Sequence, residues 1–95
     1  MTFTYDQTKD SHKFNTHKTA DAPRHAAAVT PSDTVALANY AKALYIGVTG
    51  DVVVVPVGQT ASVTFKAHPV GYLNCQVGQV MATGTTATNI LALYD

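Results

Sequence analysis

Three histidines near the N-terminus are the first residues that suggest chemistry, because imidazole nitrogens commonly bind zinc. His12, His17 and His25 have Asp10 and Asp21 as acidic neighbours. Their spacing matches neither an i, i+4 pair on a helix nor a short turn, and no cysteine joins them. The sequence therefore predicts no bound metal and no cofactor. We expect these histidines to be solvated or to lie in an interface.

Two further sites contain side chains that could act as nucleophiles. Cys75 is the single cysteine, so an intrachain disulfide is impossible. It lies in an apolar alternating stretch, which is typical of a small buried hydrophobic residue. Ser32 and Asp33 follow Pro31 in a pattern typical of a turn, without the GxSxG element of a nucleophilic serine. Because no nucleophile, base and orienting group can be assembled, the sequence predicts a protein that is not an enzyme.

A cluster of threonines surrounds Gly84, and hydroxyl groups of this kind can bind a sugar or a phosphate. Binding sites need convergent polar groups, whereas single polar turns are common. We expect a polar turn that packs against a neighbouring subunit. The cluster consists of Thr83, Thr85, Thr86 and Thr88.

Composition excludes several classes of partner. The 95 residues have a formal net charge of zero, which argues against nucleic-acid binding because that function needs a concentrated excess of Lys and Arg. There is no apolar run of about 18 residues to cross a membrane, and residues 1–21 are polar, unlike a secretion signal. We expect a soluble protein of a reducing compartment.

Charge is distributed unevenly and divides the chain into a polar N-terminal arm, residues 1–25, and a β domain, residues 26–95. The arm holds seven of the twelve charged side chains and has too few large apolar groups to fold alone. Its aromatic residues Phe3, Tyr5 and Phe14 are the predicted partner-binding anchors. In an extended segment Phe3 and Tyr5 point the same way, as in a strand added to a sheet edge.

The remainder of the chain alternates between apolar and polar residues in short runs separated by turn residues. This pattern predicts an all-β fold, a small antiparallel β-sandwich or barrel of five to seven strands with an extended N-terminal arm. Segment 33–45 is ambiguous, because its alanines and a possible cap also suit a helix. The expected strands are 43–48, 52–57, 60–67, 72–77, 80–83 and 90–94.

Two strands have apolar residues on both faces, which normally means that both faces are covered. A domain of about 70 residues has little core to spare, so oligomerisation is the expected source of stability. We predict a homo-oligomer with closed symmetry; the alternative is a stable monomeric sandwich. The predicted packing faces are Val52, Val53, Val54 and Val55 in one strand, and Leu91 and Leu93 in the other.

Four segments, taken in order, resemble the head-spike base proteins of gene transfer agents and related tailed bacteriophages. They are Ala27–Asp33, Ala43–Gly47 followed by Gly50 and Asp51, Val63–Phe65, and Ala82–Thr88 leading into Ile90, Leu93 and Tyr94. The resemblance covers roughly residues 26–95 and leaves out the arm. It favours strand and loop over helix in segment 33–45.

The resemblance implies a capsid accessory protein on the outside of a phage-like head, assembled in the host cytoplasm. It would form the oligomeric base of a head spike, as a pentamer at five-fold vertices. Its implied partners are the major capsid protein, copies of itself and a spike fibre protein. One alternative is a trimeric cement or decoration protein that clamps adjacent capsomers. Another is a receptor or carbohydrate-binding module that uses loops 68–72 and 84–88.

Overall fold

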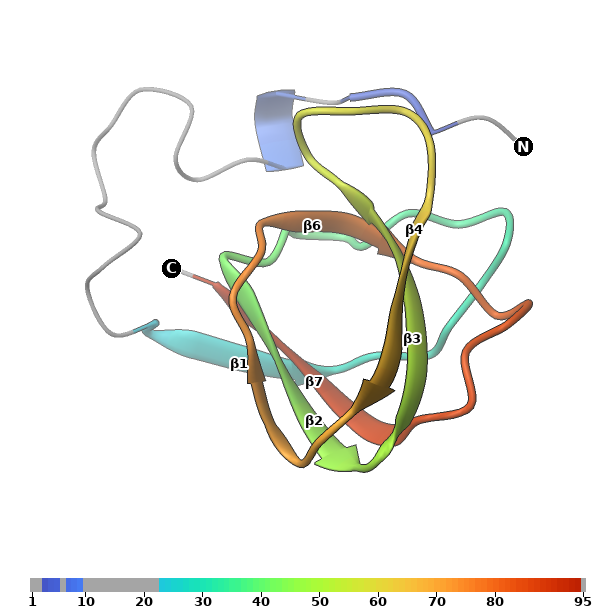
Figure 1. Ribbon diagram of the computed structural model, residues 1–95. Helices are drawn as coiled ribbons and strands as arrows, with labels where there is room; N and C mark the ends of the chain where they lie inside the picture. The colour runs from blue at the N-terminus through green and yellow to red at the C-terminus, as the bar shows by residue number, and fades with distance from the viewer. Residues whose placement is uncertain (1–2, 6, 10–22, 95) are drawn as a thin grey trace.

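The computed structural model describes residues 3–5, 7–9 and 23–94, which form an all-β protein of two antiparallel sheets (Figure 1). Sheet A has the order β1-β7-β2-β5 and sheet B the order β4-β3-β6. These seven strands confirm the expected fold class. In the described part of the chain, no helix is long and apolar enough to cross a membrane. The elements are η1 (Gln7–Lys9), β1 (His25–Ala28), β2 (Ala43–Val48), β3 (Gly50–Pro56), β4 (Val63–His68), β5 (Gly71–Leu73), β6 (Val77–Val80) and β7 (Thr88–Tyr94).

The main core lies between the two sheets and follows from alternation along each strand. In β2, Leu44 and Ile46 are fully buried, and their register partners Ala92 and Ile90 in β7 are buried beside them. Partners in antiparallel strands share a face, so these four side chains all point inward. Sheet B contributes valines and sheet A contributes leucine, isoleucine and alanine to one contiguous cluster.

Strand β3 is buried on both faces. Val52 and Val54 belong to the main core. On the other face, Val55 packs in a second cluster with Phe3 and Tyr40. Val53 lies against the turn at Gly84: a Cβ added to Gly84 would lie 3.0 Å from the Cγ2 atom of Val53. The same chain therefore supplies both layers that cover the valine run.

The segment between β1 and β2 is an irregular extended connection, so the helix considered for 33–45 is wrong and the strand-and-loop alternative is confirmed. Its backbone N–H groups bond β6 instead of the preceding turn of a helix: Ser32 to the carbonyl of Val80, and Leu37 to that of Gly78, both at 2.9 Å. Ala41 forms an isolated bridge with Val77. The connection therefore covers the outer edge of β6, which would otherwise present unpaired backbone groups.

Some strand boundaries differ from those expected. The strand expected at 72–77 is broken by a turn after Leu73, where Cys75 N–H bonds the carbonyl of Leu73 at 3.0 Å, and the strand expected at 80–83 is Val77–Val80. Strand β1 was missed because His25–Ala28 has neither alternation nor β-branched residues. It forms because β7 supplies an edge to pair with.

We predict that Val54→Ala lowers the free energy of unfolding by about 2 kcal/mol, because burial of a valine contributes about 1.5–3 kcal/mol and its removal leaves a cavity. Val48→Ala is the matched control, since Val48 is 44% exposed, and we expect it to cost about 0.5 kcal/mol. Denaturant unfolding of both variants measures the difference. Equal losses would contradict the placement of Val54 in the core.

Candidate interaction surfaces

The outer face of sheet A carries a row of uncharged side chains that crosses all four strands. Ala28 pairs with Leu91, Leu91 with Tyr45, and Tyr45 with Tyr72. Because the neighbouring residues Leu44, Ile46 and Ile90 point into the core, this row points outward. The Tyr45 and Tyr72 rings meet edge to face, with centroids 5.4 Å apart.

A second outward row lies beside the first and is also uncharged. It consists of Ala26, Leu93 and Ala43, which are partners across β1, β7 and β2. Leu91 is 37% exposed and Tyr72 is 65% exposed, so the two rows form an apolar surface that reaches solvent. We call these seven residues the sheet A surface. Apolar surfaces with exposed tyrosines are typical of protein–protein contacts.

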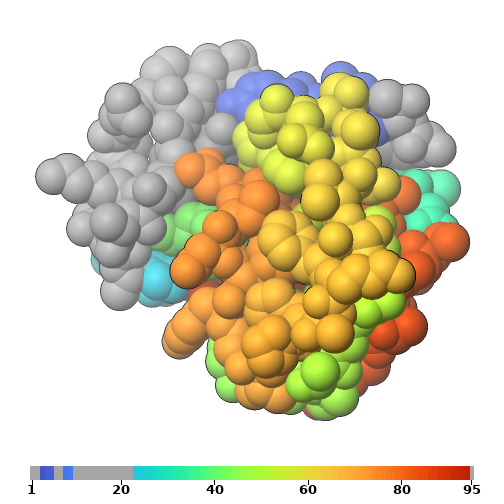
Figure 2. All heavy atoms as spheres, in the orientation of Figure 1, coloured from blue at the N-terminus to red at the C-terminus, as the bar shows by residue number. Residues whose placement is uncertain are grey.

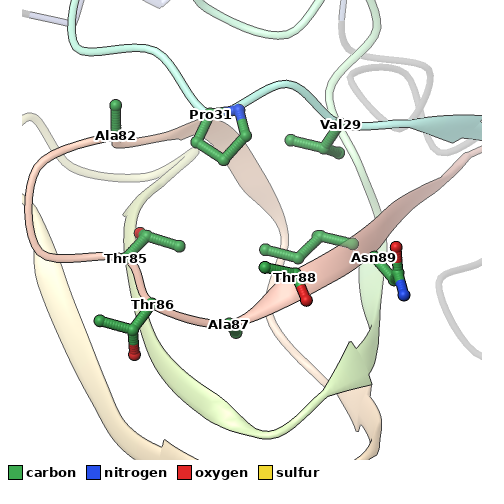
Figure 3. A pocket seen from close by; sticks show the side chains of 9 residues that line it. Val29, Pro31, Ala82, Thr85, Thr86, Ala87, Thr88 and Asn89 are labelled. Carbon is green, nitrogen blue, oxygen red and sulfur yellow. The ribbon is translucent and has the colours of Figure 1, made fainter.

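A shallow hollow of about 290 Å³ continues from this surface, between the connection after β1 and the start of β7. Figure 3 shows Val29 and Pro31 on one side and Thr85, Thr86 and Thr88 on the other. A neighbouring hollow of about 400 Å³ shares some of its lining and extends to Tyr45 and Leu91. The two hollows lie next to the sheet A surface and contain no charged side chain.

The threonine cluster at Gly84 fastens the turn to β3. Thr85 Oγ1 accepts a hydrogen bond from Val53 N–H at 3.0 Å, and Thr86 Oγ1 accepts one from Asp51 N–H at 2.9 Å. These hydroxyls therefore serve the structure of their own chain. This geometry fits the expected polar turn better than a sugar site, but the turn packs against β3 of its own chain. That it also packs against a neighbouring subunit stays a prediction.

Two aspartates hold loops in place. Asp33 accepts hydrogen bonds from the backbone N–H groups of Ala82 and Thr83, each at 3.0 Å, and from the Thr83 hydroxyl. Asp51 accepts one from Ala67 N–H at 2.8 Å, at a residue with a φ of 47°. The Thr83 hydroxyl, together with the two backbone donors, holds the pKa of the Asp33 carboxyl below its ordinary value of 3.8.

The candidate metal ligands and nucleophiles do not gather into a metal site or an active site within the described ranges. No group of three His, Cys, Asp or Glu residues is gathered there; His12 and His17 lie outside them. His25 stacks on Tyr94 with ring centroids 5.3 Å apart. The His68 Nδ1 atom lies 2.7 Å from the carbonyl of Pro69. Cys75 is half-buried, and burial raises the pKa of its thiol.

The aromatic residues of the arm lie in different environments. Phe3 is only 3% exposed and packs with Tyr40 and Val55 of its own chain. Tyr5 is 42% exposed, and its ring centroid is 5.8 Å from that of Tyr40. Phe14 lies outside the described residues. Sequence reasoning missed Tyr40, although it is one of the two aromatic residues of segment 33–45.

The predicted packing residues also separate into two groups. The four valines of β3 are buried, whereas Leu91 is exposed and Leu93 is half-buried on the sheet A surface. That Leu91 and Leu93 meet another subunit stays a prediction.

Figure 2 shows the N-terminal segment, residues 3–5 and 7–9 in blue, beside the yellow-green connection between β3 and β4.

Comparison with known proteins finds a likeness to a solved structure. No family model and no curated protein matches the chain. A solved structure described as the capsid of a native GTA (gene transfer agent) particle, computed with C5 symmetry, contains a chain that is 26% identical. The TM-score is 0.73, and the match covers 83% of this chain and 92% of that chain. The likeness supports a virion structural protein associated with a capsid.

We predict that Thr83→Val raises the pKa of Asp33 towards its ordinary value, because the hydroxyl is the largest cause of the lowered pKa. A carboxyl whose pKa is lowered by folding stabilises the native state above the unfolded pKa, and this contribution is lost as pH falls through the folded pKa. The wild type should therefore unfold at a higher temperature than the variant at neutral pH. The difference should narrow below about pH 3.8.

NMR titration of the Asp33 carboxyl and thermal unfolding across pH test this prediction. Thr60→Val is a control, since Thr60 is an exposed threonine outside the contacts of Asp33. An unchanged Asp33 titration in Thr83→Val would refute the assigned cause.

Proposed function

We propose that this chain is a non-enzymatic structural protein on the outer surface of a phage-like capsid, where it forms the oligomeric base of a head spike. The observation that carries the proposal is the match to the capsid of a GTA particle over most of both chains. The structure of that capsid was computed with C5 symmetry, and a pentameric base at a five-fold vertex has the same symmetry. The proposed partners are the major capsid protein, further copies of this chain and a spike fibre protein.

The sheet A surface supports this role because it can bury apolar area without burying charge. Its seven residues include two leucines and two tyrosines and no charged residue. Aromatic side chains are enriched in the centres of protein interfaces, and charged groups are depleted there. A surface of this composition suits permanent contact with a copy of the chain or with a capsomer.

A cement or decoration protein would use the same surface to clamp adjacent capsomers, so the two roles differ in copy number and position.

A carbohydrate-binding module has less support, because two threonine hydroxyls of loop 84–88 already accept hydrogen bonds from β3. Sugar-binding sites also require convergent polar groups, and the hollow beside that loop contains no aromatic platform.

Copy number and position on purified particles test the proposal. Quantitative mass spectrometry should find about sixty copies or fewer per particle, as expected for five-fold positions. Cryo-electron microscopy should place these copies at the vertices, on the outer surface of the head. Several hundred copies at lattice positions would establish the cement role instead. Absence from particles, or a position inside the head, would refute both.

We predict that Leu91→Asp weakens self-association or attachment to heads by about tenfold or more, because it puts an uncompensated charge in the centre of the sheet A surface. The fold should persist, since Leu91 points away from the core. Val35→Asp is the matched control, because Val35 is 68% exposed on the connection between β1 and β2. Sedimentation and a head-binding assay measure both variants. Wild-type association by Leu91→Asp would remove this surface from the proposed interface.

A further inference from the structure

The N-terminal segment, residues 3–9, packs against β3 and β6 through the ring of Phe3. The Phe3 ring fills a space that exists because residue 78 of β6 is glycine: a Cβ added there would lie 2.4 Å from the ring atoms Cε1 and Cζ. The ring of Tyr40 closes another side, with its centroid 5.6 Å from that of Phe3. Val55 of β3 completes this cluster. We call Tyr40, Val55 and Gly78 the Phe3 receptor.

Backbone contacts hold the segment in register with the receptor. Tyr40 N–H donates a hydrogen bond to the carbonyl of Lys9 at 2.8 Å, and the Tyr40 hydroxyl donates one to the carbonyl of Thr4 at 3.4 Å. A single receptor residue thus contacts both ends of segment 3–9. Figure 1 shows this segment, in blue, lying across the end of the two sheets.

The walls of the receptor come from three parts of the domain, namely the connection between β1 and β2, strand β3 and strand β6. Tyr40 is tied to β6 through its neighbour Ala41, which exchanges two backbone hydrogen bonds with Val77. Phe3, Tyr40 and Val55 form a cluster separate from the main core. A receptor built in this way accepts the same segment from its own chain or from another copy.

The length of chain between the arm and the domain permits either source. Thirteen residues, 10–22, join Lys9 to Pro23, and a stretch of this length spans at most about 45 Å. The longest dimension of the molecule is 33 Å. The joining stretch is therefore longer than the domain itself, which is the reach that an exchange between packed copies needs.

We propose that in the homo-oligomer segment 3–9 is exchanged, so that each copy inserts its Phe3 into the receptor of a neighbour. This inference rests on the oligomeric role proposed above and names the contact that closes the oligomer. Exchange of an identical element has a low cost, because the contacts within and between copies are the same. Arm and receptor are different surfaces, so in a five-fold ring each copy gives its arm to one neighbour and receives an arm from the other, and the rotation between copies closes the ring.

Complementation between two variants tests the exchange on the isolated protein. Phe3→Ala removes the inserted ring but keeps the receptor, whereas Gly78→Ala blocks the receptor but keeps the arm. Each variant alone should lose the native oligomeric mass. When an affinity-tagged Phe3→Ala chain is co-expressed with an untagged Gly78→Ala chain, the intact arm of the second should fill the intact receptor of the first, and the pair should be captured together.

The matched control pairs tagged Phe3→Ala with an untagged chain that carries both substitutions, so that no intact arm is present. Capture at least about tenfold above this control supports the exchange. Equal capture in the two pairings overturns it, as does a wild-type oligomeric mass for either single variant. Near-UV circular dichroism verifies that each variant is folded.

A second measurement keeps the wild-type receptor, so it tests the exchange of segment 3–9 even if the variants fail to fold. A photo-cross-linking phenylalanine analogue at position 5 is placed in a mixture of ¹⁴N- and ¹⁵N-labelled chains that have assembled together. Cross-links between light and heavy peptides support exchange, whereas cross-links confined to one label overturn it. Presence or absence of the protein on particles is a separate result, so failure of the exchange and failure of the capsid role are distinguishable.

Discussion

Burial of β3 on both faces is the constraint on which the rest of the structure depends. Four consecutive valines place branched apolar groups on each side of one strand, and each valine left in water would forfeit about 1.5 kcal/mol or more. Sheet A covers the inner side. The described residues form two sheets and no third one for the outer side, where the N-terminal segment and the turn at Gly84 cover the strand instead.

This arrangement explains why the loops are so firmly attached. The turn at Gly84 covers Val53 only while Thr85 and Thr86 hold it to the backbone of β3, and Asp33 holds the preceding residues from the other side. The connection between β1 and β2 bonds β6 along its length and contributes Tyr40 to the Phe3 receptor. The hydroxyls and carboxylates of these segments therefore hold the covering loops to the sheets by hydrogen bonds. This structural role explains their clustering without a binding site.

The sheet A surface is the complementary feature, since it is an apolar face that the described chain leaves open. Sheets that face water on one side normally alternate apolar residues with polar ones, whereas the outward rows here contain only alanine, leucine and tyrosine. Together with the likeness to a capsid chain, this composition is what a subunit of a larger shell requires. The arm and the sheet A surface lie on different elements, so one can join copies while the other meets a further partner.

Local pattern in the sequence was sufficient for the fold class and for most strands. Alternation in Ala43–Val48 reflects a period of two that holds wherever one face is buried, and the short apolar run 90–94 also predicted a strand. Local pattern also identified the valine run as covered on both faces and the threonines around Gly84 as a polar turn. Tertiary structure alone decided what covers the valines, because the contacts between Val55 and Phe3 and between Tyr40 and Lys9 join residues far apart in the chain. For the same reason, His25–Ala28 became a strand and segment 33–45 did not become a helix: an open edge of β7 and the backbone of β6 offered hydrogen bonds that no local propensity records.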